Sequence, residues 1–278
     1  MTSGTRRVDI DTRFKNRFAR LTRRSALFVL LTVGTIPAVR AQNTASIPEV
    51  LEDTKLYFTA PVRWDAEDWA FFGGALIAIA GSHQLDERTR NHFATGPKDG
   101  LNGGLDKNSL RDALPTVAMI AGTGFFAAFY RDSDGYRETV SLLEAGVFSA
   151  VTAQALGYAA GRERPDATTS PNRWRAGGDS FPSLHTTAAF AVGTVFAESG
   201  NDEYRWIRRL IGYGVAGATA YIRVKENDHW VSDSVAGAAL GIATARFVLN
   251  RQDREDHTAF EFAPIKNGWM ISCSMRTH

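Results

Sequence analysis

Three short stretches of the chain carry residue types that suit the binding and transfer of an oxyanion. They are GRERP (161–165), PSLH (182–185) and RVKENDHWVSD (223–233). Arg164 and Arg223 are permanent cations whose planar sets of donors match the oxygens of a phosphate group. Together the three stretches predict an anion-binding site.

Two histidines in these stretches are suited to chemistry on the bound anion. His229 and Asp233 are four residues apart, so a helix that begins near residue 229 places them on one face. A carboxylate bonded to one imidazole nitrogen fixes the tautomer and leaves the other nitrogen free to attack. His185 is a second imidazole and a candidate proton donor. Ser183 precedes a helix, where it could cap the free N–H groups or donate its hydroxyl to the anion.

The helices that position these residues are visible as apolar segments. One all-α domain is predicted, a compact bundle of about six core helices. The Gly/Asn/Asp-rich segment 86–108 is expected to be an irregular loop. If consecutive helices run antiparallel, the helix ends that carry the three stretches lie on one side of the bundle. The predicted helices span 66–82, 109–130, 137–160, 184–198, 204–222 and 230–249.

The chain is interpreted as four segments. Residues 1–41 resemble an export signal, because eight basic residues precede a short apolar run and the small residues Val39 and Ala41. Residues 42–65 form a linker or surface arm, 66–250 the helical domain, and 251–278 a tail with a hairpin at its Asn-Gly pair. Removal of 1–41 would turn the formal net charge of +2 negative, so nothing points to a nucleic-acid partner.

Other classes of site and location can be weighed from the composition. A single cysteine, Cys273, excludes a disulfide framework, and no two histidines have the i, i+4 spacing of a helical zinc site, so no metal is expected. The apolar helices reach about 13–20 residues, at or below the length that spans a bilayer, and Arg208 and Arg209 interrupt the fifth. A soluble or membrane-associated periplasmic protein is therefore favoured; the alternative is an inner-membrane protein whose site faces the periplasm. The oligomeric state is not indicated.

The order and spacing of the three stretches resemble a known family. They are similar to the signature of the type 2 phosphatidic acid phosphatase (PAP2) superfamily, which includes class A acid phosphatases and vanadium haloperoxidases. The matching residues are Arg164-Pro165, Pro182-Ser183-x-His185 and Arg223-x5-His229-x3-Asp233. The flanks SFPSLHTTAAFAVGTVFA and HWVSDSVAGAALG are also similar, and the resemblance covers about residues 66–250.

The resemblance implies a PAP2/haloperoxidase-like bundle and a metal-independent phosphatase that works through a phosphohistidine. His229 would attack phosphorus, oriented by Asp233, and His185 would protonate the leaving oxygen and later assist a water. The phosphate oxygens would be held by Arg164, Arg223, Ser183 and the backbone amides of 183–185, Leu184 included. The implied substrate is a phosphorylated lipid or a small phosphoester. No cofactor is implied, although vanadate could occupy the site as a phosphate mimic.

Three positions depart from the family signature. Gly157 replaces its lysine, Leu184 a glycine and Ile222 a serine. Loss of the lysine removes a charged hydrogen bond worth about 1.5–3 kcal/mol, which Arg162 or Lys225 could in part replace. The alternatives are therefore a vanadate-dependent haloperoxidase-type enzyme, a pseudoenzyme that binds phosphate or a lipid headgroup, and a structural bundle of the envelope.

Overall fold

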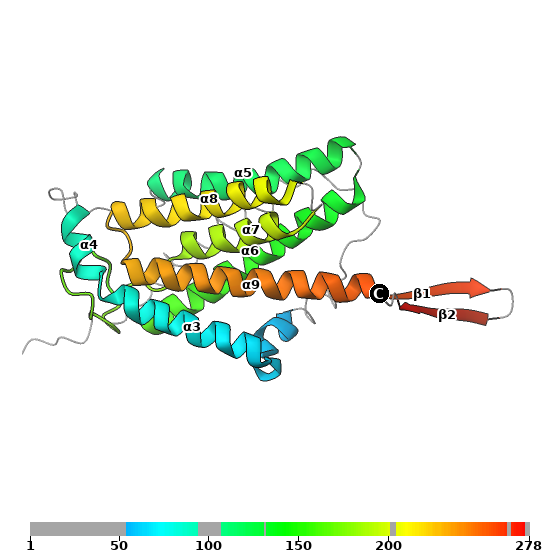
Figure 1. Ribbon diagram of the computed structural model, residues 1–278, viewed down its shortest axis with the longest axis horizontal. Helices are drawn as coiled ribbons and strands as arrows, with labels where there is room; N and C mark the ends of the chain where they lie inside the picture. Colours follow the sequence, from blue (N-terminus) through cyan, green and yellow to red (C-terminus); the bar gives the residue numbers. More distant parts are fainter. Residues whose placement is uncertain (1–53, 94–106, 131, 201–203, 266–267, 276–278) are drawn as a thin grey trace, which may run out of the picture.

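The structure is a bundle of long helices that run along one axis (Figure 1). It is a computed structural model that describes residues 54–93, 107–130, 132–200, 204–265 and 268–275, without the side chains of 107–112, 133 and 252–275. The predicted all-α architecture is confirmed, and each long helix lies within a few residues of its predicted range, except at the end of α9. The long helices are α3 (Ala66–His83), α5 (Lys107–Tyr130), α6 (Ser133–Ala160), α7 (Leu184–Glu198), α8 (Arg205–Lys225) and α9 (Val231–His257).

The segment predicted as an irregular loop contains a short helix, α4 (Asp86–Phe93). Acidic residues in its first turn and basic residues in its last turn match the helix dipole, which stabilises a helix with few apolar residues. Helix α9 continues eight residues beyond its predicted end, because the charged residues at 251–257 include good helix formers. The predicted signal segment, 1–41, lies outside the described residues.

The remaining elements are short. Residues 54–59 are helical and lead into the 3-10 helix η1 (Ala60–Arg63). The strands β1 (Thr258–Ile265) and β2 (Gly268–Met275) pair antiparallel after α9.

Helix α7 is the centre of the bundle, packed against α6, α8 and α9. Its small side chains allow backbones to approach closely. A Cβ on Gly193 would lie 2.6 Å from the carbonyl oxygen of Gly212 on α8. A Cβ on Gly241 of α9 would lie 2.4 Å from the carbonyl oxygen of Thr187. These glycines are therefore needed to hold α8 and α9 against α7.

The described part of the predicted arm, residues 54–65, is anchored to the bundle by Tyr57. Its hydroxyl lies 2.8 Å from Oγ1 of Thr244 on α9 and accepts a 3.1 Å hydrogen bond from Thr152 on α6. Its ring stacks on Phe148, with 5.0 Å between the centroids. The arm thus packs across α6 and α9 rather than standing free.

Three helices are long and apolar enough, by length and composition, to cross a membrane. Their apolar windows span Ala113–Tyr130, Asp134–Ala160 and Val231–Arg251. Large apolar side chains face outward, among them Ile77 at 76% exposure and Phe129 at 69%. Patches of this kind on a soluble protein mark contact with a membrane or another protein.

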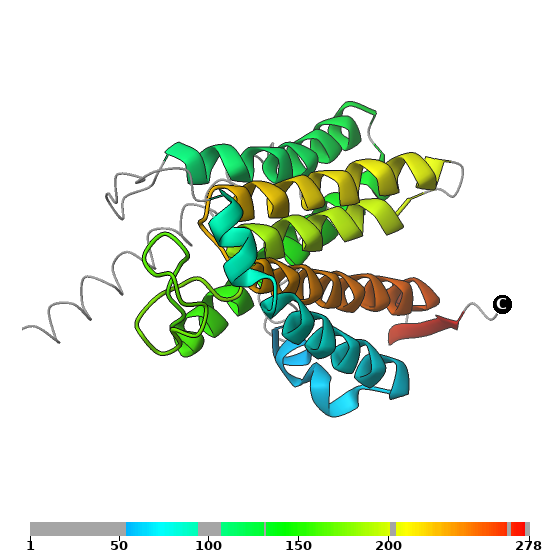
Figure 2. The same ribbon diagram turned by 60° about the vertical axis from the view of Figure 1, so that its left-hand side comes forward.

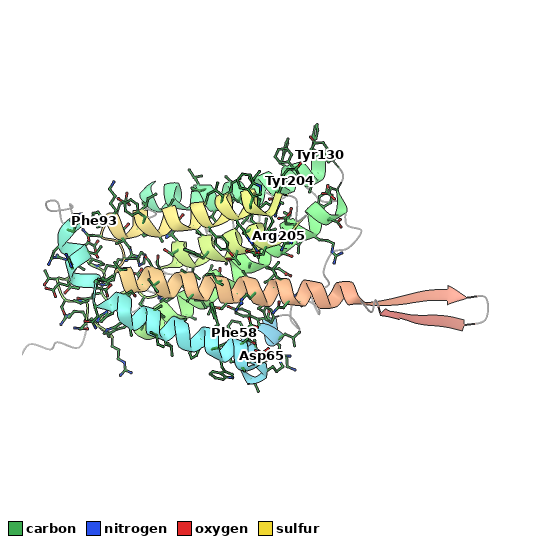
Figure 3. The ribbon with its side chains drawn as sticks, viewed as in Figure 1. Phe58, Asp65, Phe93, Tyr130, Tyr204 and Arg205 are labelled. Carbon is green, nitrogen blue, oxygen red and sulfur yellow. The ribbon has the colours of Figure 1, made fainter. Side chains whose placement is uncertain are left out.

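The charges that interrupt α8 do not oppose a membrane location. Arg208 pairs with Glu138, and Arg209 donates to Glu198 at 2.6 Å, all near one end of the bundle. Tyr130 and Tyr204 lie near this end, and Phe93 lies at the other (Figure 3). These features favour the inner-membrane alternative over a soluble domain.

The four helix ends that carry the three stretches meet, as predicted. Ser183, before α7, donates its N–H to the carbonyl oxygen of Asp233 on α9, and the indole of Trp230 donates to the carbonyl oxygen of Glu163, after α6. Figures 1 and 2 show α4 and the loop 161–183 at this same end. The bundle thus gathers the predicted site at one end.

Candidate active site

His229 lies in the turn between α8 and α9 and is 3% exposed. Its N–H donates to the carbonyl oxygen of Arg223, and Nδ1 lies 2.7 Å from the carbonyl oxygen of Ser180. A carbonyl oxygen can only accept, so Nδ1 carries the hydrogen. The lone pair of the neutral ring is therefore on Nε2.

The surroundings of His229 favour this neutral form. Burial lowers the pKa of His229 well below its ordinary 6.5, and the charges of Arg164 and Arg223 lower it further. The hydrogen bond to Ser180 opposes them only in part, and His185 is close enough to lower the pKa as well. At neutral pH the ring has a lone pair available for attack on an electrophile.

Asp233 does not contact the His229 ring directly, which differs from the prediction. The carboxylate lies 3.9 Å from Nδ1, beyond hydrogen-bond distance. Because α9 begins at Val231, His229 lies outside the helix, and the helical i, i+4 geometry does not apply. Asp233 instead accepts hydrogen bonds from the Ser180 hydroxyl, from the N–H of Trp230 at 2.9 Å, and from Arg162. It therefore acts on His229 through Ser180.

The two predicted phosphate-binding arginines each pair with a nearby carboxylate. Arg164 donates from Nε and Nη2 to Asp179 at 2.8 and 3.3 Å. Burial alone would lower the pKa of Arg164, but Asp179 outweighs it and the pKa is raised. Arg223 is buried and lies 3.0 Å from Asp228. Both cations flank His229, and an anion that binds there competes with these carboxylates.

The start of α7 contributes less to the site than predicted. Ser183 makes no side-chain cap, and its N–H is used on Asp233, so this amide is not available to an anion. Its fully buried hydroxyl accepts a 3.0 Å hydrogen bond from Thr186, which leaves its own hydrogen to donate. His185, the second residue of α7, is half-buried.

Leu184 points away from the anion site. Its side chain packs against the buried cluster formed by Ala113, Ala150 and Ala188. The bulk that replaces the family's glycine is therefore accommodated in the core between α5, α6 and α7.

The lysine position is occupied by Gly157, which is buried on the last turns of α6. A Cβ there would lie 3.4 Å from the carbonyl oxygen of Phe181, an ordinary contact. Arg162 does not replace the lysine, because it is fully buried and its donors go to protein acceptors. Lys225 is exposed at the end of α8.

Two residues of the site were not predicted from the sequence. Asp86 is the first residue of α4 and is 1% exposed, and Ser180 precedes α7. Asp86 fell in a segment expected to be irregular, and Ser180 acts through a backbone carbonyl, which has no signal in residue type. Only their positions near the starts of helices could have marked them.

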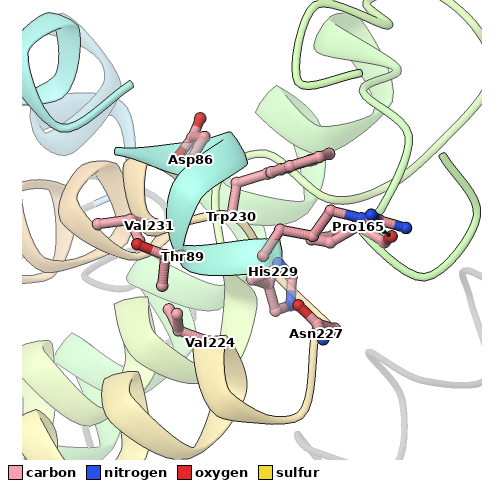
Figure 4. A pocket seen from close by; sticks show the side chains of 9 residues that line it. Asp86, Thr89, Pro165, Val224, Asn227, His229, Trp230 and Val231 are labelled. Atoms are coloured by element: carbon pink, nitrogen blue, oxygen red, sulfur yellow. Dashed lines mark hydrogen bonds between the residues drawn. The ribbon is translucent and has the colours of Figure 1, made fainter. Parts of the chain in front are cut away.

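A shallow surface depression, too narrow to enclose a water molecule, adjoins His229 (Figure 4). It is bordered by α4 on one side and by the turn between α8 and α9 on the other. Helix α4 thus closes the site on the side of His229. The lining residues are Asp86, Thr89, Arg90, Pro165, Val224, Asn227, His229, Trp230 and Val231.

Comparison with known proteins agrees with this arrangement. The model of the PAP2 superfamily matches residues 138–256, which run from α6 to α9 and include all three stretches. The part of the chain from α6 to α9 is therefore similar to the PAP2 superfamily. Helices α3, α4 and α5 precede the matched residues, so the Asp86 side of the site lies outside the match.

Two proteins similar to the chain were found. A lipid A 1-phosphatase from Porphyromonas gingivalis is 40% identical over 85 residues, which cover 31% of this chain and 17% of that relative's length. A crystal structure of a transmembrane PAP2-type phosphatidylglycerolphosphate phosphatase from Bacillus subtilis is 16% identical, with a TM-score of 0.36. That comparison covers 84% of this chain and 96% of the other. A TM-score of this size does not establish a common fold.

Proposed function

We propose that this protein is a phosphatase of membrane lipids that hydrolyses phosphate monoesters through a phosphohistidine, without a metal ion. The observation that carries the proposal is the state of His229. Its Nδ1 hydrogen is committed to Ser180, its Nε2 lone pair is free of that bond, and two arginines flank it. The similarity of the surrounding helices to the PAP2 superfamily supports phosphate as the bound anion.

The first step forms a bond between Nε2 of His229 and phosphorus and breaks the bond from phosphorus to the leaving oxygen. His185 donates a proton to that oxygen, so an alcohol leaves. Arg164 and Arg223 stabilise the charge on the phosphate oxygens, and the Ser183 hydroxyl donates to one of them.

The second step hydrolyses the phosphohistidine. His185, now neutral, takes a proton from a water molecule that attacks phosphorus, and the bond from phosphorus to Nε2 breaks. Inorganic phosphate leaves and His229 returns to its starting tautomer. The hydrogen stays on Nδ1 and is donated to the Ser180 carbonyl oxygen throughout, which keeps the ring in one orientation.

Two features support a lipid substrate and a membrane location. The bundle has three helices able to cross a membrane and exposes large apolar side chains. The similar protein from Porphyromonas gingivalis is a lipid A 1-phosphatase, although the match spans only 17% of its length. We propose a phosphorylated membrane lipid as the substrate class, and small phosphoesters as weaker substrates.

We further propose that the site faces the periplasm from the inner membrane. The basic residues of the N-terminal segment favour the cytoplasm, and the apolar run 26–36 is too short to span the bilayer. Residues 1–41 are then retained rather than removed as an export signal, and α3 runs from the cytoplasmic side to the site, although it is not among the three helices identified as able to cross a membrane. With Cys273 replaced by serine, Arg173→Cys in the site loop should react with an impermeant maleimide on intact spheroplasts. Protection until the membrane is opened would reverse the orientation.

The activity is tested on the full chain in detergent, with an aryl phosphate and a phosphorylated lipid, in the presence of EDTA. The His229→Ala variant should lose at least about 10³-fold in kcat, whereas His92→Ala, an exposed residue of α4, should stay near wild type. A radiolabelled intermediate should be acid-labile, stable to alkali and absent from His229→Ala. Full activity in His229→Ala, or activity that needs added metal, would reject the mechanism.

A further inference from the structure

A buried ionic cluster lies behind the candidate site. Arg162 donates from Nη2 to Asp86 at 2.7 Å and from Nη1 to Asp233, and the side chains of all three are fully buried. The central carbon of its planar guanidinium also lies 4.5 Å from the ring centroid of Trp174 and 5.4 Å from that of Trp230. One arginine thus joins two carboxylates from segments about 147 positions apart in the chain.

Asp86 also holds the first turn of α9. It accepts the N–H of Ser232 at 2.9 Å and the hydroxyl of Ser232 at 2.6 Å. Ser232 lies in the first turn, where backbone N–H groups have no acceptor within the helix. Asp86 therefore caps α9 from α4, next to the turn that carries His229.

The same cluster leads to the imidazole. Asp233 accepts the hydroxyl of Ser180, and the carbonyl of Ser180 accepts Nδ1 of His229. The position of Nε2 thus depends on the Ser180 carbonyl, and Ser180 is held by Asp233. Asp233 is held in turn by the Arg162 guanidinium, which also pairs with Asp86.

We propose that Asp86 is a positioning residue for the reaction, acting on His229 through Arg162 and the first turn of α9. The inference rests on the proposed function and adds a residue of α4, outside the residues matched to the PAP2 superfamily, to the machinery. If Asp86 loses its charge, Arg162 keeps Asp233 as its one carboxylate partner in place of two. The guanidinium is then attracted toward Asp233 without the opposing attraction of Asp86. Displacement of a reacting atom by about 1 Å is enough to reduce a rate about 10²-fold.

The test compares Asp86→Asn with a matched variant at the far end of the bundle. Glu138→Gln also breaks a partly buried ion pair, with Arg208, but lies away from the site. On the full chain in detergent, Asp86→Asn should lower kcat about 30- to 100-fold with KM within threefold of wild type. Glu138→Gln should leave kcat within threefold, even where the two variants lose similar thermal stability.

A milder variant covers the case in which Asp86→Asn does not fold. Ser232→Ala removes the hydroxyl contacts to Asp86 and Arg162 but keeps the backbone N–H, and should lower kcat about three- to tenfold at unchanged KM.

Three results would overturn the inference. The first is a wild-type kcat in folded Asp86→Asn, and the second is an effect of that variant on KM alone. The third is an equal loss of kcat in Glu138→Gln at the same folded fraction. If Asp86→Asn does not fold, a wild-type kcat in Ser232→Ala overturns the inference instead. An inactive wild-type protein would instead refute the proposed function, and with it this role.

Discussion

The backbone carbonyl oxygen of Ser180 lies 2.7 Å from Nδ1 of His229 and holds the imidazole in one tautomer. A backbone carbonyl does not titrate in the pH range where proteins are folded, so it accepts this hydrogen bond throughout that range. The ring is therefore oriented by the loop before α7, and burial beside two arginines keeps it neutral. A nucleophile of this kind is ready near neutral pH without a base to deprotonate it.

The lowered pKa of His229 predicts how stability depends on pH. In the unfolded chain His229 takes up a proton near pH 6.5, whereas the folded site takes it up only well below that value. The unfolded state then binds more protons, so the free energy of unfolding falls as pH drops below about 6.5, by up to about 1.4 kcal/mol per pH unit. Denaturant titrations of wild type and His229→Gln between pH 7 and 5 should show a shallower slope for the variant. Equal slopes would contradict the shifted pKa.

The pairing of Arg164 with Asp179 predicts a gain of function. A phosphate must compete with Asp179, so Asp179→Asn should release the guanidinium. The pair is partly exposed, with side chains at 23% and 36%, and is worth less than about 1 kcal/mol. The inhibition constant of inorganic phosphate should therefore fall about two- to fivefold.

The matched control for Asp179→Asn is Glu163→Gln. It frees Arg173 in the same loop, at a pair whose nitrogen and oxygen are 3.3 Å apart, but does not touch Arg164. It should leave phosphate inhibition unchanged. Weaker phosphate binding in Asp179→Asn would show that Asp179 orients Arg164 rather than competing for it.

The sequence predicts the elements of this protein better than the contacts between them. Apolar segments and polar boundaries identify α5, α6, α7 and α8, because amphipathic periodicity and capping are local properties. They miss α4, which is held by its charges and by contacts from distant segments. The meeting of four helix ends follows from antiparallel packing and could be predicted.

The finer geometry of the site could not be predicted. The spacing of His229 and Asp233 suggested a direct contact, but the helix starts two residues after His229, so a backbone carbonyl takes that place. The role of Arg162 was open as well. Arg162 is two residues before Arg164 and is oriented inward, and only tertiary structure decides which of the two arginines faces the anion.

The packing of Leu184 predicts that restoring the family's glycine would be harmful. Leu184 fills space against Ala113, Ala150 and Ala188, so Leu184→Gly should leave a cavity and lower the free energy of unfolding by about 2–4 kcal/mol. Phosphate inhibition should stay within about twofold, because the side chain points away from the anion. Leu184→Met, which conserves volume, should cost less than about 1.5 kcal/mol. Tighter phosphate binding in Leu184→Gly would show that the leucine crowds the site.

The space at Gly157 predicts that the missing lysine can be restored. Within 4 Å, a Cβ on Gly157 would meet only the carbonyl oxygen of Phe181, which lies 3.4 Å away. A side chain can therefore leave α6 along the segment that leads to the site. Replacing a glycine inside a helix also favours folding by about 0.5–1 kcal/mol. An ammonium that reaches the phosphate should add about 1.5–3 kcal/mol, so Gly157→Lys should raise kcat/KM on an aryl phosphate about 10- to 100-fold.

The control for Gly157→Lys is Gly157→Met, which has similar length and no charge. It should gain stability without the gain in kcat/KM, and added salt should reduce the advantage of the lysine variant. If both variants behave alike, the ammonium does not reach the anion, and Arg164 and Arg223 carry the phosphate charge without a third cation from α6.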